Sequence, residues 1–382
     1  EQKGDISTAI DLAEQASTIW HQEEGWKIRL AHLYQEVGDI EKANETWVEI
    51  IEHSSKLDSV LYQYTDLLIN NGKGLEVLQL IERYKDQIPE SFDYLLTQAK
   101  AFALLNKFDK CDISIQLAKK IKPNSYELEY LEAELFYLKG DIEKSKVKVR
   151  ELLEKLPGFE KGYILNAKLH LESGKYVEAI KIIDSGLGLC NLKKGLYLEK
   201  IHNLRQLKEF SKGLLIASDL YQNHPGDTEV MRILAQLYFD IDDFQAAEVV
   251  SRKSLHLRPN QSEMHYLLGQ IAKRQGQLDQ ALDNFIKAGL SDQTSLDPWL
   301  EIGDIYIEQQ QSEKAIDAYK EVYSRNEKDY RGYYKTGLLL RDLKDYEGAE
   351  KMLRIASSLS PKDANIRRQL AGVIALNLVH SS

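Results

Sequence analysis

Small residues recur in this chain at a fixed distance of 34 positions. In a first series, nine of eleven positions hold Gly or Ala: Ala31, Thr65, Ala99, Ala133, Ala167, Ile201, Ala235, Gly269, Gly303, Gly337 and Ala371. In a second series, ten of eleven positions are small: Ala9, Ala43, Val77, Cys111, Ser145, Ala179, Gly213, Ala247, Ala281, Ala315 and Ala349. Two helices approach closely only where their side chains are short. The two series therefore predict repeated helix crossings in a chain of tandem repeats.

Turn residues mark the borders of these repeats. Six of the seven prolines share one register, in which proline ends a helix: Pro89, Pro123, Pro157, Pro225, Pro259 and Pro361. Another register holds residues suited to the left-handed backbone that closes a helix: Gly4, Gly38, Gly72, Asn106, Gly140, Gly174 and Gly276. Asp5, Asp39 and Asp141 follow three of these glycines and are expected to cap the next helix. Each repeat is thus predicted to be a helix, a tight turn, a second helix and a proline-marked turn.

Between these landmarks the apolar residues have helical spacing. Trp299, Ile302 and Tyr306 form one stripe, and Ala315 and Tyr319 belong to another. A single helical pair cannot bury both stripes. The repeats are therefore expected to stack on one another.

The order of these landmarks resembles the tetratricopeptide repeat (TPR) family. The resemblance rests on Trp299, Ile302, Gly303, Tyr306, Ala315 and Tyr319, on Gly337, Ala349, Leu353, Ala356 and Pro361, and on Gly269, Ala281, Phe285 and Ala288. It implies an all-α fold, a right-handed superhelix (α-solenoid) of helix-turn-helix repeats. In this register the chain is one solenoid over 1–382, with a half repeat at 1–23, ten full repeats at 24–363 and a final half repeat or capping helix at 364–382. The repeat at 194–227 departs most from the pattern and is expected to pack more loosely.

Composition restricts the partners. The formal net charge of -10 is spread along the chain, which argues against nucleic acid or an anionic membrane as a partner. No apolar run is long enough to insert into a membrane. The chain begins inside a repeat, so we expect a fragment of a longer protein. The compartment is left open between the cytoplasm and a bacterial periplasm.

Catalytic and metal-binding patterns are missing from the sequence. The nine histidines are scattered, and the two cysteines form no cluster with them. The glycine-rich stretch at 184–190 follows a helix rather than a strand, which argues against a nucleophile elbow or a phosphate loop. We expect no enzyme activity, no cofactor and no metal site.

The first helices are where binding is expected, because the resemblance implies that they line a concave face. Ten residues are the candidates for a peptide-binding groove: Tyr62, Ile69, Tyr130, Glu134, Tyr137, Phe239, Tyr266, Leu300, Ile307 and Tyr334. Tyrosine offers a contacting partner an apolar ring with a polar tip. The alternative interpretation is that these side chains pack between successive first helices. The register that carries the asparagine of a chaperone-tail clamp in other TPR domains holds no Asn here, but Lys168, Lys273, Arg274, Arg331 and Arg341 remain candidates for contact with an acidic ligand.

Three functional interpretations follow. The first is a non-catalytic scaffold that binds a protein or peptide in the concave groove. The second is an accessory TPR domain of a larger enzyme or of a bacterial polysaccharide or protein export assembly. The third is self-association through the terminal helices, because the final helix retains Val373, Ile374, Leu376, Leu378 and Val379.

Overall fold

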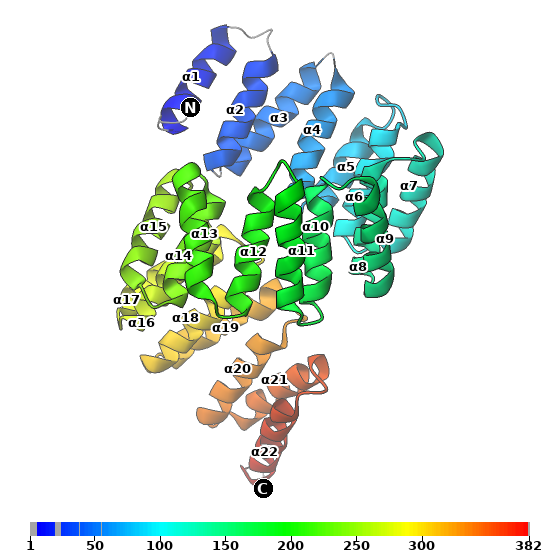
Figure 1. Cartoon of the computed structure of the whole chain (residues 1–382). Helices are drawn as coiled ribbons and strands as arrows, with labels where there is room; N and C mark the ends of the chain where they lie inside the picture. Colours follow the sequence, from blue (N-terminus) through cyan, green and yellow to red (C-terminus); the bar gives the residue numbers. More distant parts are fainter. Residues whose placement is uncertain (1–5, 20–23, 38, 55, 381–382) are drawn as a thin grey trace. The chain divides into compact units, whose positions relative to one another are not determined.

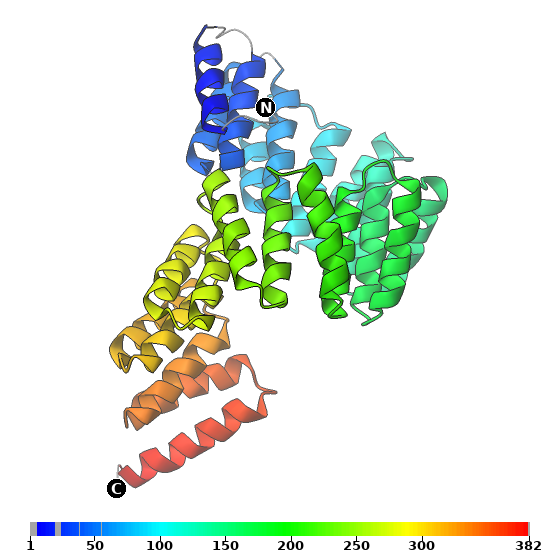
Figure 2. The ribbon, with the colours of Figure 1, turned by 60° about the vertical axis from the view of Figure 1, so that its left-hand side comes forward.

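The computed structural model describes residues 6–19, 24–37, 39–54 and 56–380, which fold into twenty-two α-helices joined by short turns (Figure 1, Figure 2). The chain forms two compact parts, residues 1–237 and 238–382, and their boundary falls within α14. The N-terminal part contains α1 (Ile6–Ile19), α2 (Glu24–Val37), α3 (Ile40–His53), α4 (Leu57–Asn70), α5 (Gly74–Tyr84), α6 (Phe92–Leu104), α7 (Phe108–Ile121), α8 (Tyr126–Leu138), α9 (Ile142–Lys155), α10 (Glu160–Leu171), α11 (Tyr176–Leu189), α12 (Lys194–Gln206), α13 (Phe210–Asn223) and most of α14 (Thr228–Asp240). The C-terminal part contains α15 (Phe244–Leu257), α16 (Ser262–Arg274), α17 (Leu278–Ser291), α18 (Asp297–Glu308), α19 (Ser312–Arg325), α20 (Tyr330–Asp342), α21 (Tyr346–Leu359) and α22 (Ala364–His380).

This architecture confirms the predicted fold class, an all-α TPR solenoid of helix-turn-helix repeats with a 34-residue period. First helices carry even numbers and second helices carry odd numbers. The expected half repeat at 1–23 lies partly outside the described residues. The interpretation of 1–382 as one continuous solenoid stays a prediction.

The turn between the two helices of a repeat has the left-handed conformation that the sequence predicts. Nine described residues at 34-residue spacing have positive φ, between 54° and 80°: Gly72, Asn106, Gly140, Gly174, Lys208, Asp242, Gly276, Gln310 and Lys344. All five predicted turn residues that the structure describes are among them. Gly4 and Gly38 lie outside the described residues. At α8, the Gly140 N–H donates to the Tyr137 carbonyl at 2.9 Å and the Asp141 N–H donates to the Phe136 carbonyl at 2.9 Å, which satisfies the last carbonyls of the helix.

Aspartate caps the second helix in several repeats. The Asp39 carboxylate accepts the Lys42 N–H at 3.2 Å, and the Asp141 carboxylate accepts the Lys144 N–H at 3.3 Å, as predicted. Asp5 lies outside the described residues. Two caps in the same register were not predicted: Asp243 accepts from Ala246 at 3.0 Å, and Asp345 accepts from Gly348 at 2.9 Å. Each such cap stabilises its helix by about 1 kcal/mol.

The first small-residue series lies against large side chains of the second helix. A Cβ atom on Gly269 would lie 2.6 Å from the Phe285 ring, and one on Gly337 would lie 2.8 Å from Cγ of Leu353. These short residues therefore let the two helices of a repeat approach closely. Ala371 in α22 is the described exception, because it is exposed.

In the divergent repeat at 194–227 the large residue lies on the first helix and the small residue on the second, the reverse of most other repeats. Ile201 is fully buried in α12 where other repeats have Ala or Gly. Ala217 is fully buried in α13, in the register that holds Phe285 and Tyr319 in later repeats. The large side chain has moved from the second helix to the first, so this repeat keeps a buried contact of comparable volume.

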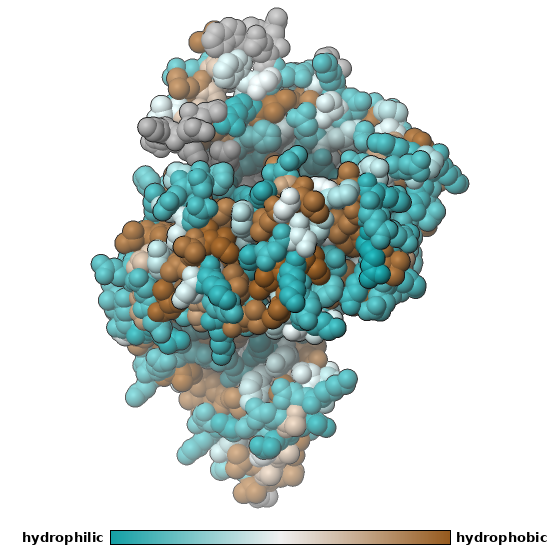
Figure 3. All heavy atoms as spheres, in the orientation of Figure 1, coloured by the Kyte–Doolittle hydropathy of each residue, from teal (hydrophilic) through white to brown (hydrophobic). Residues whose placement is uncertain are grey.

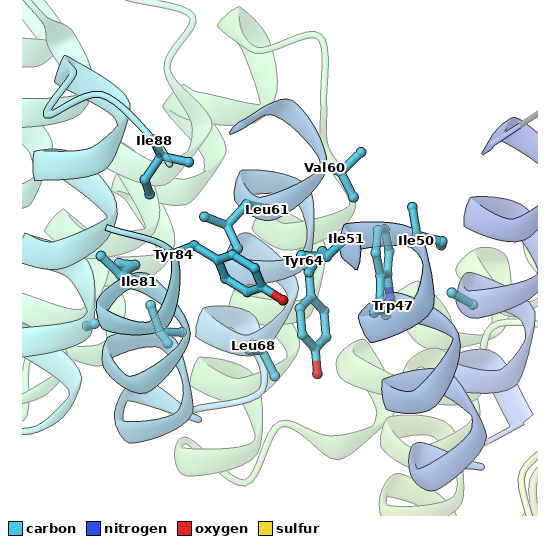
Figure 4. Close-up of a cluster of buried hydrophobic side chains, with 13 residues drawn as sticks. Trp47, Ile50, Ile51, Val60, Leu61, Tyr64, Leu68, Ile81, Tyr84 and Ile88 are labelled. Atoms are coloured by element: carbon cyan, nitrogen blue, oxygen red, sulfur yellow. The ribbon is translucent and has the colours of Figure 1, made fainter. Parts of the chain in front are cut away.

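Aromatic packing fills the core near the start of the chain. Trp47 of α3 is fully buried, and its ring stacks on that of Tyr64 of α4 with a centroid distance of 5.4 Å (Figure 4). The Tyr64 hydroxyl donates to the Asn44 side chain at 2.8 Å, which satisfies the phenol inside the core. Burial raises the pKa of Tyr64 to about 12.

Candidate functional site

Successive first helices of the N-terminal part contact one another, from α4 to α6, α8, α10 and α12. This places them in one layer, and a groove of about 780 Å³ lies over four of them. The groove is lined by Asp66, Ile69, Asn70, Lys100, Ala103, Leu104, Asn106, Glu127, Tyr130, Leu131, Glu134, Leu138, Phe159, Lys161 and Ile164. Its volume is in the range of pockets that enclose ligands.

Apolar side chains provide much of the groove surface. Leu104 of α6 and Leu138 of α8 are each 41% exposed, although each sits at the end of a helix where a polar residue would be expected. The Tyr130 ring meets the Phe159 ring edge-on, at a centroid distance of 5.5 Å. Exposed leucines beside fixed aromatic rings are typical of surfaces that bind protein segments.

Polar groups lie among these side chains. The Lys100 ammonium group is 3.1 Å from the Asp66 carboxylate, which joins α6 to α4. The Tyr130 hydroxyl donates to the Glu134 carboxylate at 3.3 Å. Burial raises the pKa of the Glu134 carboxyl above its ordinary value, while the Tyr130 hydrogen bond and the nearby Lys168 and Lys161 act in the opposite direction.

Three of the ten candidate residues line this groove: Ile69, Tyr130 and Glu134. Tyr62 and Tyr137 belong to the same row of first helices but do not line the groove. The Tyr62 hydroxyl is 3.3 Å from the Ser91 hydroxyl, and the Tyr137 hydroxyl donates to Glu172 at 3.0 Å. Both tyrosines connect neighbouring repeats.

The remaining five candidates belong to the C-terminal part or its border. The Phe239 and Tyr266 rings contact Phe244 and Phe285, at centroid distances of 5.6 Å and 5.4 Å. The Tyr334 hydroxyl accepts a hydrogen bond from Asn365 at 2.7 Å. Ile307 is 38% exposed.

Leu300 does not lie on an open surface. It is 8% exposed and packs in a core cluster with Tyr319 and Val322. The sequence pattern predicts it among the residues that line a peptide-binding groove. The core cluster combines α19 of the same repeat with Leu339 of the next repeat, and it buries Leu300 instead.

Ion pairs between repeats occupy the first helices of the C-terminal part. Lys273 pairs with Glu301 at 2.8 Å, Arg331 with Asp297 at 2.6 Å, and Lys335 with Asp304 at 2.7 Å. Charges already paired in this way gain little from an incoming partner. Of the five cations considered for an acidic ligand, Lys273, Arg331 and Arg341 are paired, and Arg341 binds Asp342 at 2.7 Å.

Sequence reasoning missed Leu104, Leu138, Phe159 and Lys161. A signal for two of them was present, because Leu104 and Leu138 are 34 positions apart and directly follow Ala103 and Tyr137. At the end of α8, for example, sequence reasoning assigned Tyr137 to the groove, whereas the next residue, Leu138, lines it.

The described part of the chain contains no helix that is both long and apolar enough to span a membrane. Within the same residues no group of three or more His, Cys, Asp or Glu side chains is arranged to hold a metal ion. Cys111 and Cys190 are buried, and burial raises the pKa of the Cys111 thiol to about 12.

Comparisons with known proteins agree with this architecture. Two models described as tetratricopeptide repeat match residues 262–288 and 300–364. The TPR repeat-containing protein YpiA of Bacillus subtilis (strain 168) is 22% identical over 380 residues, which cover 92% of this chain and 83% of that protein. The crystal structure of yeast Tom70 aligns at 13% identity with a TM-score of 0.58, over 98% of this chain and 93% of that chain. The crystal structure of MamA aligns at 22% identity with a TM-score of 0.39, over 43% of this chain and 96% of that chain. The unbroken period, the left-handed turns and the matching repeat models together show that the chain contains tetratricopeptide repeats.

Proposed function

We propose that this chain is a non-catalytic protein-interaction scaffold, and that the groove over α4, α6, α8 and α10 binds a segment of a partner protein. The observation that carries the proposal is the pair of exposed leucines, Leu104 and Leu138, on successive first helices within a groove of about 780 Å³. Their exposure costs free energy in water, and a partner's apolar side chain would recover it.

The length of the groove suggests an extended segment. Packed helices are about 8–10 Å apart, so four successive first helices span roughly 25–30 Å. An extended chain advances about 3.3 Å per residue, so about eight or nine residues would cross all four helices. A segment of this size suits an exposed loop or a chain terminus of the partner.

The polar side chains would fix the direction of this segment. Glu127 and Lys161 are exposed on neighbouring first helices at the groove. Asn70 and Asn106 offer amide groups at its other side. Amide side chains both donate and accept hydrogen bonds, so they suit the backbone of an extended peptide.

The contrast with the C-terminal part supports this choice of site. Among the described residues, the corresponding helices there carry three ion pairs between repeats, including Lys273 with Glu301 and Lys335 with Asp304, whereas the groove lining holds one, Lys100 with Asp66. Burying such pairs under a partner requires desolvation that their mutual attraction does not repay.

Selection of peptides on the full chain tests the proposal. A displayed library of random peptides of the groove's length would be selected on the wild type, and the Kd of each binder measured by fluorescence anisotropy. Leu138→Glu should weaken binding about tenfold or more, equivalent to about 1.4 kcal/mol. The matched control is Val147→Glu, because Val147 is 50% exposed on a second helix away from the groove.

Two results would refute the proposal. One is a set of binders whose Kd is the same on Leu138→Glu as on the wild type. The other is an equal loss of binding on Leu138→Glu and Val147→Glu, which would point to a general effect of added charge. Circular dichroism of each variant checks that its helical content is unchanged.

A further inference from the structure

A second apolar hollow lies on the side of the second helices, away from the groove. It has a volume of about 410 Å³ and lies where α11, α12 and α13 meet. Its lining residues are Val177, Ile180, Lys181, Lys200, Leu204, Leu207, Glu209, Lys212, Leu215 and Ile216. Hydrophobic and hydrophilic residues lie side by side over these helices (Figure 3).

The apolar side chains of this hollow are unusually open to water. Leu215 of α13 is 75% exposed and Val177 of α11 is 51% exposed. A single exposed leucine is ordinary on a protein surface. Here, however, Leu215 and Val177 border a floor that contains Leu204 and Leu207, so the apolar surface is continuous and hollowed.

The hollow belongs to the divergent repeat. The register of Leu215 holds Asp283 and Asp317 in two repeats of the C-terminal part, and the exposed apolar residues Ile113, Val147 and Val249 in three other repeats. Repeat packing therefore does not require an apolar residue at this position. Leu215 makes little contact within the chain and borders the hollow, so the apolar surface that it forms with Val177, Leu204 and Leu207 is open to a partner.

Charge surrounds the hollow. Residues 175–212 contain eight Lys or Arg and four Asp or Glu, a net charge of +4 in a chain whose formal net charge is -10. Three lysines line the hollow itself. Lys200 pairs with Asp184 at 2.6 Å and Lys212 pairs with Glu209 at 2.7 Å. Lys181 forms no ion pair with the residues that the structure describes.

We propose that this hollow docks an acidic amphipathic helix of a partner protein. Leucine or phenylalanine side chains on one face of that helix would enter the hollow beside Leu215 and Val177. Carboxylates on its flanks would lie near Lys181, the lysine of the hollow that forms no ion pair with the described residues. The site is separate from the groove over α4 to α10, so the scaffold would hold two partners at once.

Charge complementarity favours a helix over an anionic bilayer. Acidic residues such as Asp184 and Glu209 lie between the lysines. A helix can place its carboxylates opposite the lysines and away from Asp184 and Glu209. A uniformly anionic bilayer would also lie against these acidic residues and be repelled by them. The net negative charge of the whole chain also opposes binding to such a surface.

The test uses the full chain and a displayed library of helical peptides. The library fixes leucines at helical i, i+3, i+4 and i+7 spacing and randomises the other positions among Glu, Lys, Gln and Ala. The selected peptides should be rich in Glu, and their affinity should fall as ionic strength rises. Leu215→Glu should raise their Kd about tenfold or more, while Val147→Glu and the groove variant Leu138→Glu should leave it unchanged.

Val147 is the matched control because it occupies the register of Leu215 two repeats earlier and is also exposed. Selected peptides that are neutral or basic would overturn the proposal, as would peptides that bind Leu215→Glu as tightly as the wild type. Binding to phosphatidylcholine–phosphatidylglycerol vesicles that Leu215→Glu abolishes would overturn it in favour of a bilayer. A dimer in sedimentation velocity that Leu215→Glu dissociates would overturn it in favour of a second copy of the chain.

Discussion

Replacing Gly303 with alanine should destabilise the repeat that contains α18 and α19. Gly303 is buried in α18, and a Cβ atom there would lie 2.6 Å from Cδ1 of Tyr319 and nearer still to Cε1. The Tyr319 ring cannot easily turn away, because it is 3% exposed and its hydroxyl donates to Asp304 at 2.6 Å. The added methyl group therefore has to move the helices apart or break this hydrogen bond.

The expected loss follows from two opposing effects. Alanine within a helix is favoured over glycine by about 1 kcal/mol. Overpacking a core costs about 1–3 kcal/mol, and the short distance and the fixed ring place Gly303→Ala near the upper value. The net loss should be about 2 kcal/mol. Gly372→Ala is the control, because Gly372 is exposed in α22 and a Cβ atom there meets nothing within 4 Å.

Urea unfolding followed by circular dichroism, with hydrogen exchange of the α18 and α19 amides, measures this difference. Repeat proteins can unfold in segments, so local protection is the more direct readout. Adding Tyr319→Ile to Gly303→Ala recreates the Ala and Ile pair found at Ala99 and Ile115, and should recover part of the loss. A Gly303→Ala variant as stable as the wild type, or more stable, would refute the role assigned to the small-residue series.

Three further predictions concern the divergent repeat, the turns and the groove. Ile201→Ala should lower the free energy of unfolding by about 2–5 kcal/mol, because the facing second helix already has the small residue Ala217 and cannot fill the cavity. Adding Ala217→Ile should recover part of this loss. If the effects of the two substitutions on urea unfolding are simply additive, the proposed exchange of large and small residues is contradicted. Lys344→Gly should raise the thermal midpoint by relieving the left-handed strain at φ 66°, with a gain of up to about 1 kcal/mol, and a lower midpoint would argue against this. For Glu134, burial raises the folded-state pKa, so the stability it contributes is present below the ordinary pKa of glutamate and is lost as pH rises through the raised value. Glu134→Gln should therefore gain stability relative to the wild type at about pH 7 and gain less at about pH 4, and a pH-independent difference in urea unfolding would contradict this.

The repeat architecture could be predicted because its causes are local and recur. The left-handed turn needs a suitable residue at one point, so Gly72, Gly140 and Gly276 revealed its register. The same register also identifies Lys208 and Lys344, which have positive φ although neither is a residue that favours it. The spacing therefore marks the left-handed turn also at positions that the sequence analysis did not name, because their residue type gives no signal.

The open groove could not be predicted in the same way. Tyr130 and Tyr266 occupy the same register four repeats apart, yet Tyr130 lines the groove and Tyr266 packs against Phe285 beside helices that carry paired charges. Whether a first helix is open depends on the side chains of its own second helix and of the neighbouring repeat that contact it. Leu300 shows the same limit, because a cluster with Tyr319 of its own repeat and Leu339 of the next repeat buries it.

Photo-cross-linking of a groove-selected peptide tests the central claim most directly. A benzophenone amino acid is placed at Leu104, at Leu138 or at Val147, and the cross-linked peptide is located by mass spectrometry. If the groove over α4 to α10 is the binding site, the peptide is captured at positions 104 and 138 and not at 147. Capture at 147 with none at 104 or 138 would contradict the account.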